Sequence, residues 1–163
     1  MPDNQLLKQL LQHGFRYAYS LTHNKAQAED FVQDAWLSMM KHRNPQTKAY
    51  FYTVIRNKFL NQLKHEKIVP LISVETTKTE ESLTSTEEEL SNILADKDMI
   101  DKALAHIKPL EREIIYLYYF EEYSTVEISE LTDLSKGMVC SLIHRTRLKL
   151  KEHIHSLEKK VLP

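Results

Sequence analysis

The segment STVEISELTDLSKGMVCSLIHRTRLKLK, residues 124–151, contains two helical patterns separated by a short turn. Ser124 and Glu127 form an S-x-x-E capping box, which predicts the start of the first helix. Residues 132–134 form the predicted turn, and Ser135 then caps a longer helix with an apolar stripe. Two helices joined by a tight turn, the second with basic residues on its outer side, are typical of a helix-turn-helix.

The outer side of the second helix carries the side chains that reading DNA requires. The guanidinium of Arg145 can form two hydrogen bonds to a guanine edge, while ammonium groups neutralise phosphates. We predict that the residues in contact with double-stranded DNA are Lys136, Met138, Ser141, Leu142, His144, Arg145 and Lys149. A helical hairpin with a solvated basic face is the alternative for this segment taken alone.

Composition favours helices along the whole chain. The 163 residues include only two glycines, Gly14 and Gly137. Folds built from strands and turns, and loops that bind phosphate, need more glycine than this because glycine readily adopts positive φ. With helical apolar periodicity in every ordered stretch, the sequence predicts an all-α fold.

Other totals exclude several classes of protein. No stretch approaches about 20 apolar residues and no signal peptide is evident, so we expect a cytoplasmic protein without membrane insertion. Cys140 is the only cysteine, which excludes an internal disulfide or a Cys-based metal cluster. His153 and His155 point away from each other on a helix, so we expect no metal and no cofactor.

Charge is segregated along the chain. Residues 1–67 hold ten basic and five acidic residues, and residues 134–163 hold seven basic and two acidic ones. Between them, residues 68–98 hold two basic and eight acidic residues. We interpret residues 68–91 as a flexible acidic linker between two small helical domains, residues 1–67 and 92–163, with an acidic surface loop as the alternative.

The N-terminal domain is expected to contain three helices. The first would have an apolar face of four leucines (Leu6, Leu7, Leu10 and Leu11) continued by Phe15, Ala18 and Tyr19. The second, near residues 25–41, would bury a stripe that includes Phe31 and Trp36. The third would run over residues 47–66 and expose a face that is basic and rich in amides. In the C-terminal domain, a helix over residues 92–107 and another opened by Pro109 would precede the helix-turn-helix.

Three segments together resemble sigma factors of the extracytoplasmic function (ECF) group, the small two-domain members of the sigma-70 family. AEDFVQDAWLSMM (28–40) resembles the helix that docks on the polymerase β′ clamp, and AYFYTVIRNKFLNQLK (49–64) resembles the helix that reads and opens the −10 element. Residues 104–151 resemble the domain that reads the −35 element. The resemblance implies core RNA polymerase (β′ clamp and β flap), double-stranded and melted promoter DNA, and an anti-sigma factor as partners.

The residues agree with these implied roles. The predicted polymerase-binding residues project away from the apolar stripe of the second helix: Asp30, Gln33, Asp34 and Leu37. The residues predicted to bind −10 DNA supply cations, amides and flat rings: Tyr50, Tyr52, Arg56, Asn57, Lys58, Asn61 and Lys64. Tyr50 could equally belong to the core. Turned-out bases would be held by the loop at residues 42–49, which lacks a glycine.

The recognition helix departs from the family pattern. Cys140 and Leu142 occupy positions that are usually basic, which predicts weaker binding with a shallower salt dependence. Leu142 could instead contact a thymine methyl group.

Two other functions are open from sequence. A stand-alone helix-turn-helix regulator would bind an operator without polymerase, and a helical enzyme would need a buried cluster of titratable groups. We expect no catalytic site.

Overall fold

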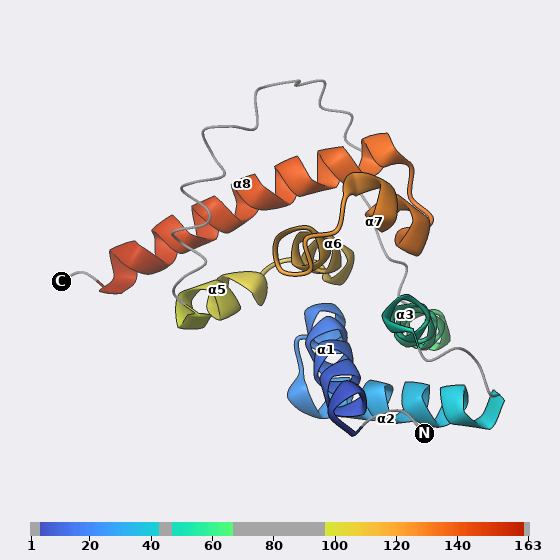
Figure 1. Ribbon diagram of the computed structural model, residues 1–163. Helices are drawn as coiled ribbons and strands as arrows, with labels where there is room; N and C mark the ends of the chain where they lie inside the picture. Colours follow the sequence, from blue (N-terminus) through green and yellow to red (C-terminus); the bar gives the residue numbers. More distant parts are fainter. Residues whose placement is uncertain (1–3, 43–46, 67–96, 162–163) are drawn as a thin grey trace. The chain divides into compact units, whose positions relative to one another are not determined.

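The computed structural model describes residues 4–42, 47–66 and 97–161, which form two compact units within residues 1–72 and 73–163 (Figure 1). Over the described residues, the regular secondary structure is entirely helical, so the all-α prediction is confirmed. The predicted linker, residues 68–91, and residues 43–46 of the predicted loop lie outside the described residues.

The N-terminal unit contains α1 (Asn4–Thr22), α2 (Lys25–His42) and α3 (Lys48–His65), which all pack against one another. Polar caps place the helix starts close to where the sequence predicts them. Asn24 Oδ1 accepts a hydrogen bond from the Gln27 N–H at 3.0 Å, and Thr47 Oγ1 accepts one from the Tyr50 N–H at 3.2 Å. Each cap satisfies a backbone donor that the first turn of a helix leaves without a partner.

The face predicted for α1 is only partly right. Ala18 is fully buried as expected, whereas Phe15 and Tyr19 are partly exposed, none of the four leucines is buried, and Leu6 is 62% exposed. The buried side of α1 is formed by Gly14, Tyr17, Ala18 and Leu21, which continue the arc of Leu7, Leu10 and Leu11 at helical spacing. Helix α3 comes close to α1 at Gly14, where its Phe51 ring occupies the space that a side chain would need.

The C-terminal unit contains α5 (Lys97–Leu104), α6 (Pro109–Tyr119), α7 (Thr125–Thr132) and α8 (Lys136–Val161). Pro109 occupies the first turn of α6 as predicted, because its missing N–H costs nothing there. The helix predicted to begin at residue 92 is described only from Lys97, and it ends at Leu104 rather than at residue 107.

The helix-turn-helix is confirmed in its detail. The capping box pairs Ser124 with Glu127 in both directions, at 3.2 and 3.1 Å. The turn passes through Asp133 in the left-handed region (φ 58°, ψ 20°), and Ser135 Oγ then accepts from the Met138 N–H at 3.1 Å. These contacts fix the angle between α7 and α8.

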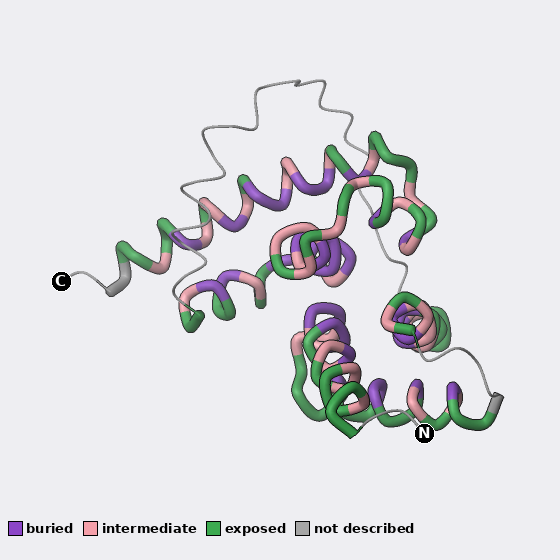
Figure 2. The backbone as a smooth tube through the Cα atoms, in the orientation of Figure 1, coloured by how far each residue is buried: buried purple, intermediate pink, exposed green. Residues whose placement is uncertain are grey.

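Helix α8 serves as the long support of the C-terminal unit and packs against α5, α6 and α7. Its buried residues recur along one side (Figure 2). The predicted basic helix ended near residue 151, but α8 continues to Val161. The added turns are apolar on the inner side, where Ile154 and Leu157 join a cluster with Ile100 and Ala103 of α5.

Candidate nucleic-acid interface

The outward face of α2 is acidic with an apolar centre. Asp30, Gln33, Asp34 and Leu37 are all exposed, opposite a buried stripe that includes Ala28, Phe31, Ala35 and Met39. Leu37 is 65% exposed and Met40, one turn further along, is 52% exposed. The sequence pattern missed Met40, although its spacing of three from Leu37 places it on the same face. Two large apolar side chains within a charged face suit a protein partner better than solvent.

The outward face of α3 has a different chemistry. Asn57, Asn61 and Lys64 are exposed, Tyr50 is partly exposed beside them, and Lys58 is partly exposed on the flank. Amides can pair with base edges, an ammonium group can hold a phosphate, and the Tyr50 ring can stack on an unpaired base. Tyr50, for which the sequence left two roles open, therefore lies on the outer side of α3.

Two residues predicted to touch −10 DNA lie in the core instead, so the structure corrects both assignments. Tyr52 is fully buried, and its ring stacks on Tyr17 with 4.3 Å between the ring centroids. Its hydroxyl donates to the His13 carbonyl oxygen at 3.3 Å. Arg56 is only 8% exposed. Both side chains lie on the arc of α3 that faces α1 and α2, so neither reaches a ligand outside the unit.

The exposed side of α8 begins at Lys136 and continues through Cys140 to Leu148, which is 45% exposed. Ser141, His144 and Arg145 lie along the same side and are partly exposed, as is Met138 at its edge. The sequence did not predict that Leu148 is exposed, because its basic and apolar neighbours give no local sign of the direction in which its side chain points. The exposed side of α8 therefore carries few charges and several small side chains, which can fit within a major groove.

Of two predicted DNA contacts on α8, Leu142 is contradicted by its burial, while Lys149 has a partner inside the unit although its side chain is 40% exposed. Leu142 is 1% exposed because it points into the core, so it cannot meet a thymine methyl group. Lys149 Nζ donates to both carboxylate oxygens of Glu111, at 2.9 and 3.1 Å. Glu111 is 4% exposed on α6, and this ion pair ties α8 to α6 rather than to a phosphate.

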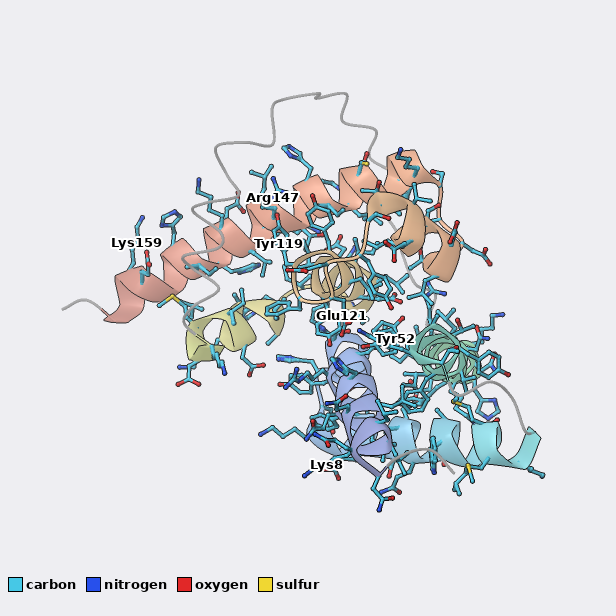
Figure 3. The ribbon with its side chains drawn as sticks, in the orientation of Figure 1. Lys8, Tyr52, Tyr119, Glu121, Arg147 and Lys159 are labelled. Carbon is cyan, nitrogen blue, oxygen red and sulfur yellow. The ribbon has the colours of Figure 1, made fainter. Side chains whose placement is uncertain are left out.

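Buried cations hold the C-terminal unit together, which the sequence did not reveal. Arg112 Nη1 donates to the carbonyl oxygens of Leu104 and Ile107, at 3.3 and 2.8 Å, and so satisfies the end of α5. Arg147 is 2% exposed, and its guanidinium lies over the Tyr119 ring, 5.7 Å from the centroid (Figure 3). Part of the basic character of α8 is therefore structural.

The two surfaces of the N-terminal unit differ in sign. Within its three helices, the acidic residues are Glu29, Asp30 and Asp34, all on α2 and all exposed. Helices α1 and α3 contain none. A carboxylate-bearing face repels DNA and attracts a basic protein, whereas a face with cations only attracts phosphates.

Comparison with known proteins identifies the family of this chain. The model of sigma-70 region 2 matches residues 6–68, and the model of sigma-70 region 4 matches residues 97–150. The ECF RNA polymerase sigma factor SigL of Mycobacterium tuberculosis is 30% identical over 137 residues, which cover 80% of this chain and 76% of SigL. The chain belongs to the sigma-70 family. It is a sigma factor of the ECF group, and it directs transcription initiation by RNA polymerase.

Other relatives agree over nearly the full length. The sigma factor YlaC of Bacillus subtilis is 24% identical over 157 residues, which cover 91% of this chain and 90% of YlaC. The structure of the sigma factor RpoE of Bartonella quintana, solved with the anti-sigma factor NepR, has a TM-score of 0.66 at 24% identity. The match covers 93% of this sigma factor and 95% of RpoE, and it supports the fold.

Two searches of the described residues found nothing further. None of their helices is long and apolar enough to cross a membrane. Over the same ranges, no three or more His, Cys, Asp or Glu side chains come together to hold a metal ion.

Proposed function

We propose that this sigma factor divides its work among three helix faces: α2 binds core polymerase, α3 acts on the −10 element, and α8 reads the −35 element. The N-terminal domain would be residues 1–67 and the C-terminal domain residues 92–163, as the sequence predicts. The factor acts as a polymerase subunit in the cytoplasm and has no catalytic role of its own. The observation that carries the proposal is the opposite chemistry of the outward faces of α2 and α3.

On α2, the proposed contact residues are Asp30, Gln33, Asp34 and Leu37, to which we add Met40. The apolar pair at its centre would bury against the polymerase clamp, while the carboxylates would meet basic side chains around it. On α3, the proposed −10 contacts are Tyr50, Asn57, Lys58, Asn61 and Lys64. Tyr52 and Arg56 support that surface from beneath.

On α8, the proposed −35 contacts are Lys136, Met138, Ser141, His144 and Arg145. Because Lys149 is held by Glu111, the helix has fewer cations for phosphates than its sequence suggests. The −35 contact is therefore expected to depend weakly on salt. Each unit would bind weakly alone, and their covalent connection raises the effective concentration of the second once the first is bound.

We further propose an anti-sigma factor as a regulatory partner. The support is the structural similarity to RpoE, which was solved with NepR. Such a partner would compete with core polymerase if it covered the Leu37–Met40 surface, because that is the exposed apolar part of α2.

The decisive experiment combines purified chain and core polymerase with a promoter template. The expected results are capture of core enzyme and promoter-dependent transcripts. The double variant Asp30→Ala/Gln33→Ala should weaken core binding about tenfold or more, since both residues lie at the centre of the face. Asp98→Ala is the matched control: it also removes an exposed carboxylate, but on α5 and not on α2.

Failure of the wild-type chain to bind core enzyme or to yield transcripts would refute the proposal. Sequence-specific binding of free protein to an operator, without polymerase, would support a stand-alone regulator instead. Equal core binding by the double variant and by Asp98→Ala would remove α2 as the docking face.

A further inference from the structure

Two rows of side chains follow one another along one flank of α1, outside the buried arc. At 100° per residue, positions 8, 12 and 16 form one row, and positions 15, 19 and 23 form the next. Lys8, Gln12 and Arg16 of the first row are all exposed. Lys8 lies on the side of α1 away from α3 (Figure 3). None of these three side chains contributes to the core formed by Tyr17, Ala18 and Leu21.

The second row consists of aromatic rings. Phe15 and Tyr19 stack with 6.4 Å between their centroids and 15° between their planes. His23, directly after the helix, meets the Tyr19 ring edge-on at 5.0 Å and 83°. All three residues are partly exposed. The contacts hold the rings in a fixed ladder, which reduces the entropy lost when a ligand packs against them.

This flank is positively charged, and no acidic residue of its own helix balances that charge. Helix α1 contains no acidic residue, and neither does α3; the described carboxylates of the unit are those on α2 and Glu66, which follows the end of α3. Lys8 and Arg16 are separated by eight residues, which corresponds to about 12 Å along the helix. The flank therefore offers two cations with an amide between them, followed toward the end of α1 by a row of rings that begins level with Arg16.

We propose that the α1 flank, formed by Lys8, Gln12, Arg16, Phe15, Tyr19 and His23, is a further binding site for single-stranded promoter DNA. Cations that follow a phosphate backbone beside aromatic rings that contact bases are the usual means of binding a single strand. Duplex DNA would contact the cations, but its paired bases would not be available to stack on the rings. A protein partner would be expected to use a drier and more apolar surface. The site rests on the proposed function, because it needs a promoter that has been opened.

The test uses holoenzyme reconstituted from core polymerase and the full chain. Two fluorescent promoter fragments serve as probes, one with a permanently unpaired bubble at the −10 element and one fully paired and held closed at low temperature. In Lys8→Gln/Arg16→Gln, affinity for the bubble fragment should fall about tenfold. The slope of log affinity against log salt should become shallower by about 1.4, since each single-strand phosphate contact contributes about 0.7. Affinity for the closed fragment should change little.

A matched control removes two exposed cations elsewhere. Lys25→Gln/Lys102→Gln makes the same change of net charge on α2 and α5 and should bind the bubble fragment as the wild type does. A third variant, Tyr19→Leu, keeps an apolar side chain but removes the ring. It should bind the bubble about fivefold more weakly or worse, with an unchanged salt slope. Core affinity and the circular dichroism of each free variant are measured alongside.

The outcomes separate this site from the proposed function. If wild-type holoenzyme forms transcripts but Lys8→Gln/Arg16→Gln matches it in bubble affinity and salt slope, the α1 site does not exist. If that variant instead loses core binding, the flank faces polymerase and the proposal is wrong. If wild-type holoenzyme neither binds the bubble nor transcribes, the proposed function fails first, and the α1 site fails with it.

Discussion

Replacing Gly14 by alanine should destabilise the N-terminal unit, although alanine is the better helix former. A Cβ at position 14 would lie 2.2 Å from Phe51 Cε1 and 3.0 Å from Cδ1 and Cζ. Ordinary contact begins near 3.4 Å, so the ring or the helix must move by about 1.2 Å. Phe51 is fully buried and cannot swing into solvent without giving up its own burial.

The magnitude follows from two opposing effects. An overlap of about 1.2 Å with a fully buried ring lies in the upper part of the range for overpacking a core, at about 2–3 kcal/mol. The higher helix propensity of alanine returns about 1 kcal/mol. We therefore expect Gly14→Ala to lower the free energy of unfolding by about 1–2 kcal/mol, or about 5–15 °C in Tm.

Trp36, the only tryptophan in the chain, lies on α2 and makes its fluorescence a specific probe of the N-terminal unit during urea or thermal unfolding. Gly137→Ala is the control of opposite sign, because a Cβ there meets nothing within 4 Å. It should leave the Trp36 transition unchanged and stabilise α8 by up to about 1 kcal/mol. The clash also predicts coupling: Gly14→Ala should cost less in a Phe51→Leu background. A Gly14→Ala protein as stable as wild type by Trp36 fluorescence would refute the reasoning.

Three further predictions concern the C-terminal unit. Ser124→Ala removes half of the capping box and should cost about 1 kcal/mol in urea unfolding followed by circular dichroism, whereas no change would mean that the box is not formed in solution. Asp133→Gly should leave stability equal or higher because φ is 58° there, whereas Asp133→Val should cost about 1–2 kcal/mol; the reverse order in thermal unfolding would contradict the left-handed turn. Burial, with the carboxylates of Glu121 and Glu127, raises the pKa of Tyr123 above its ordinary value. The stability gained from its neutral phenol is complete below that ordinary value and is lost as pH rises through the raised pKa, so Tyr123→Phe should unfold with a flatter alkaline limb than wild type.

The helices of this sigma factor and several of their starts could be read from local patterns. Asn24, Thr47, Pro109 and Ser124 act within a few residues of themselves, so the chain alone shows where α2, α3, α6 and α7 begin. Family membership could also be predicted from the amino-acid sequence, since three segments resemble the family in the same order. The acidic face of α2 could also be predicted, because the strong apolar stripe must face the core and leaves the opposite side of the helix exposed.

Which side of a helix faces the core was harder to predict where apolar and polar residues alternate less clearly. Tyr50 and Tyr52 are the same residue type two positions apart, yet one lies on the outer side and the other is fully buried against Tyr17. On α1, the predicted face extended to Phe15 and Tyr19, which are partly exposed, whereas the buried arc runs through Gly14, Tyr17, Ala18 and Leu21. Helical periodicity gives the angle between two side chains, and only packing against another helix fixes the direction of either.

The same limit applies to charge. By itself the sequence determined the helical fold, the caps, the helix-turn-helix and the separation of basic from acidic segments. Only the tertiary structure decided that Lys149 belongs to Glu111, 38 residues earlier in the chain, and that Leu148 rather than Leu142 is exposed on α8. Local interactions are written in neighbouring residues, whereas an ion pair or a buried face depends on which distant helix comes to lie beside it.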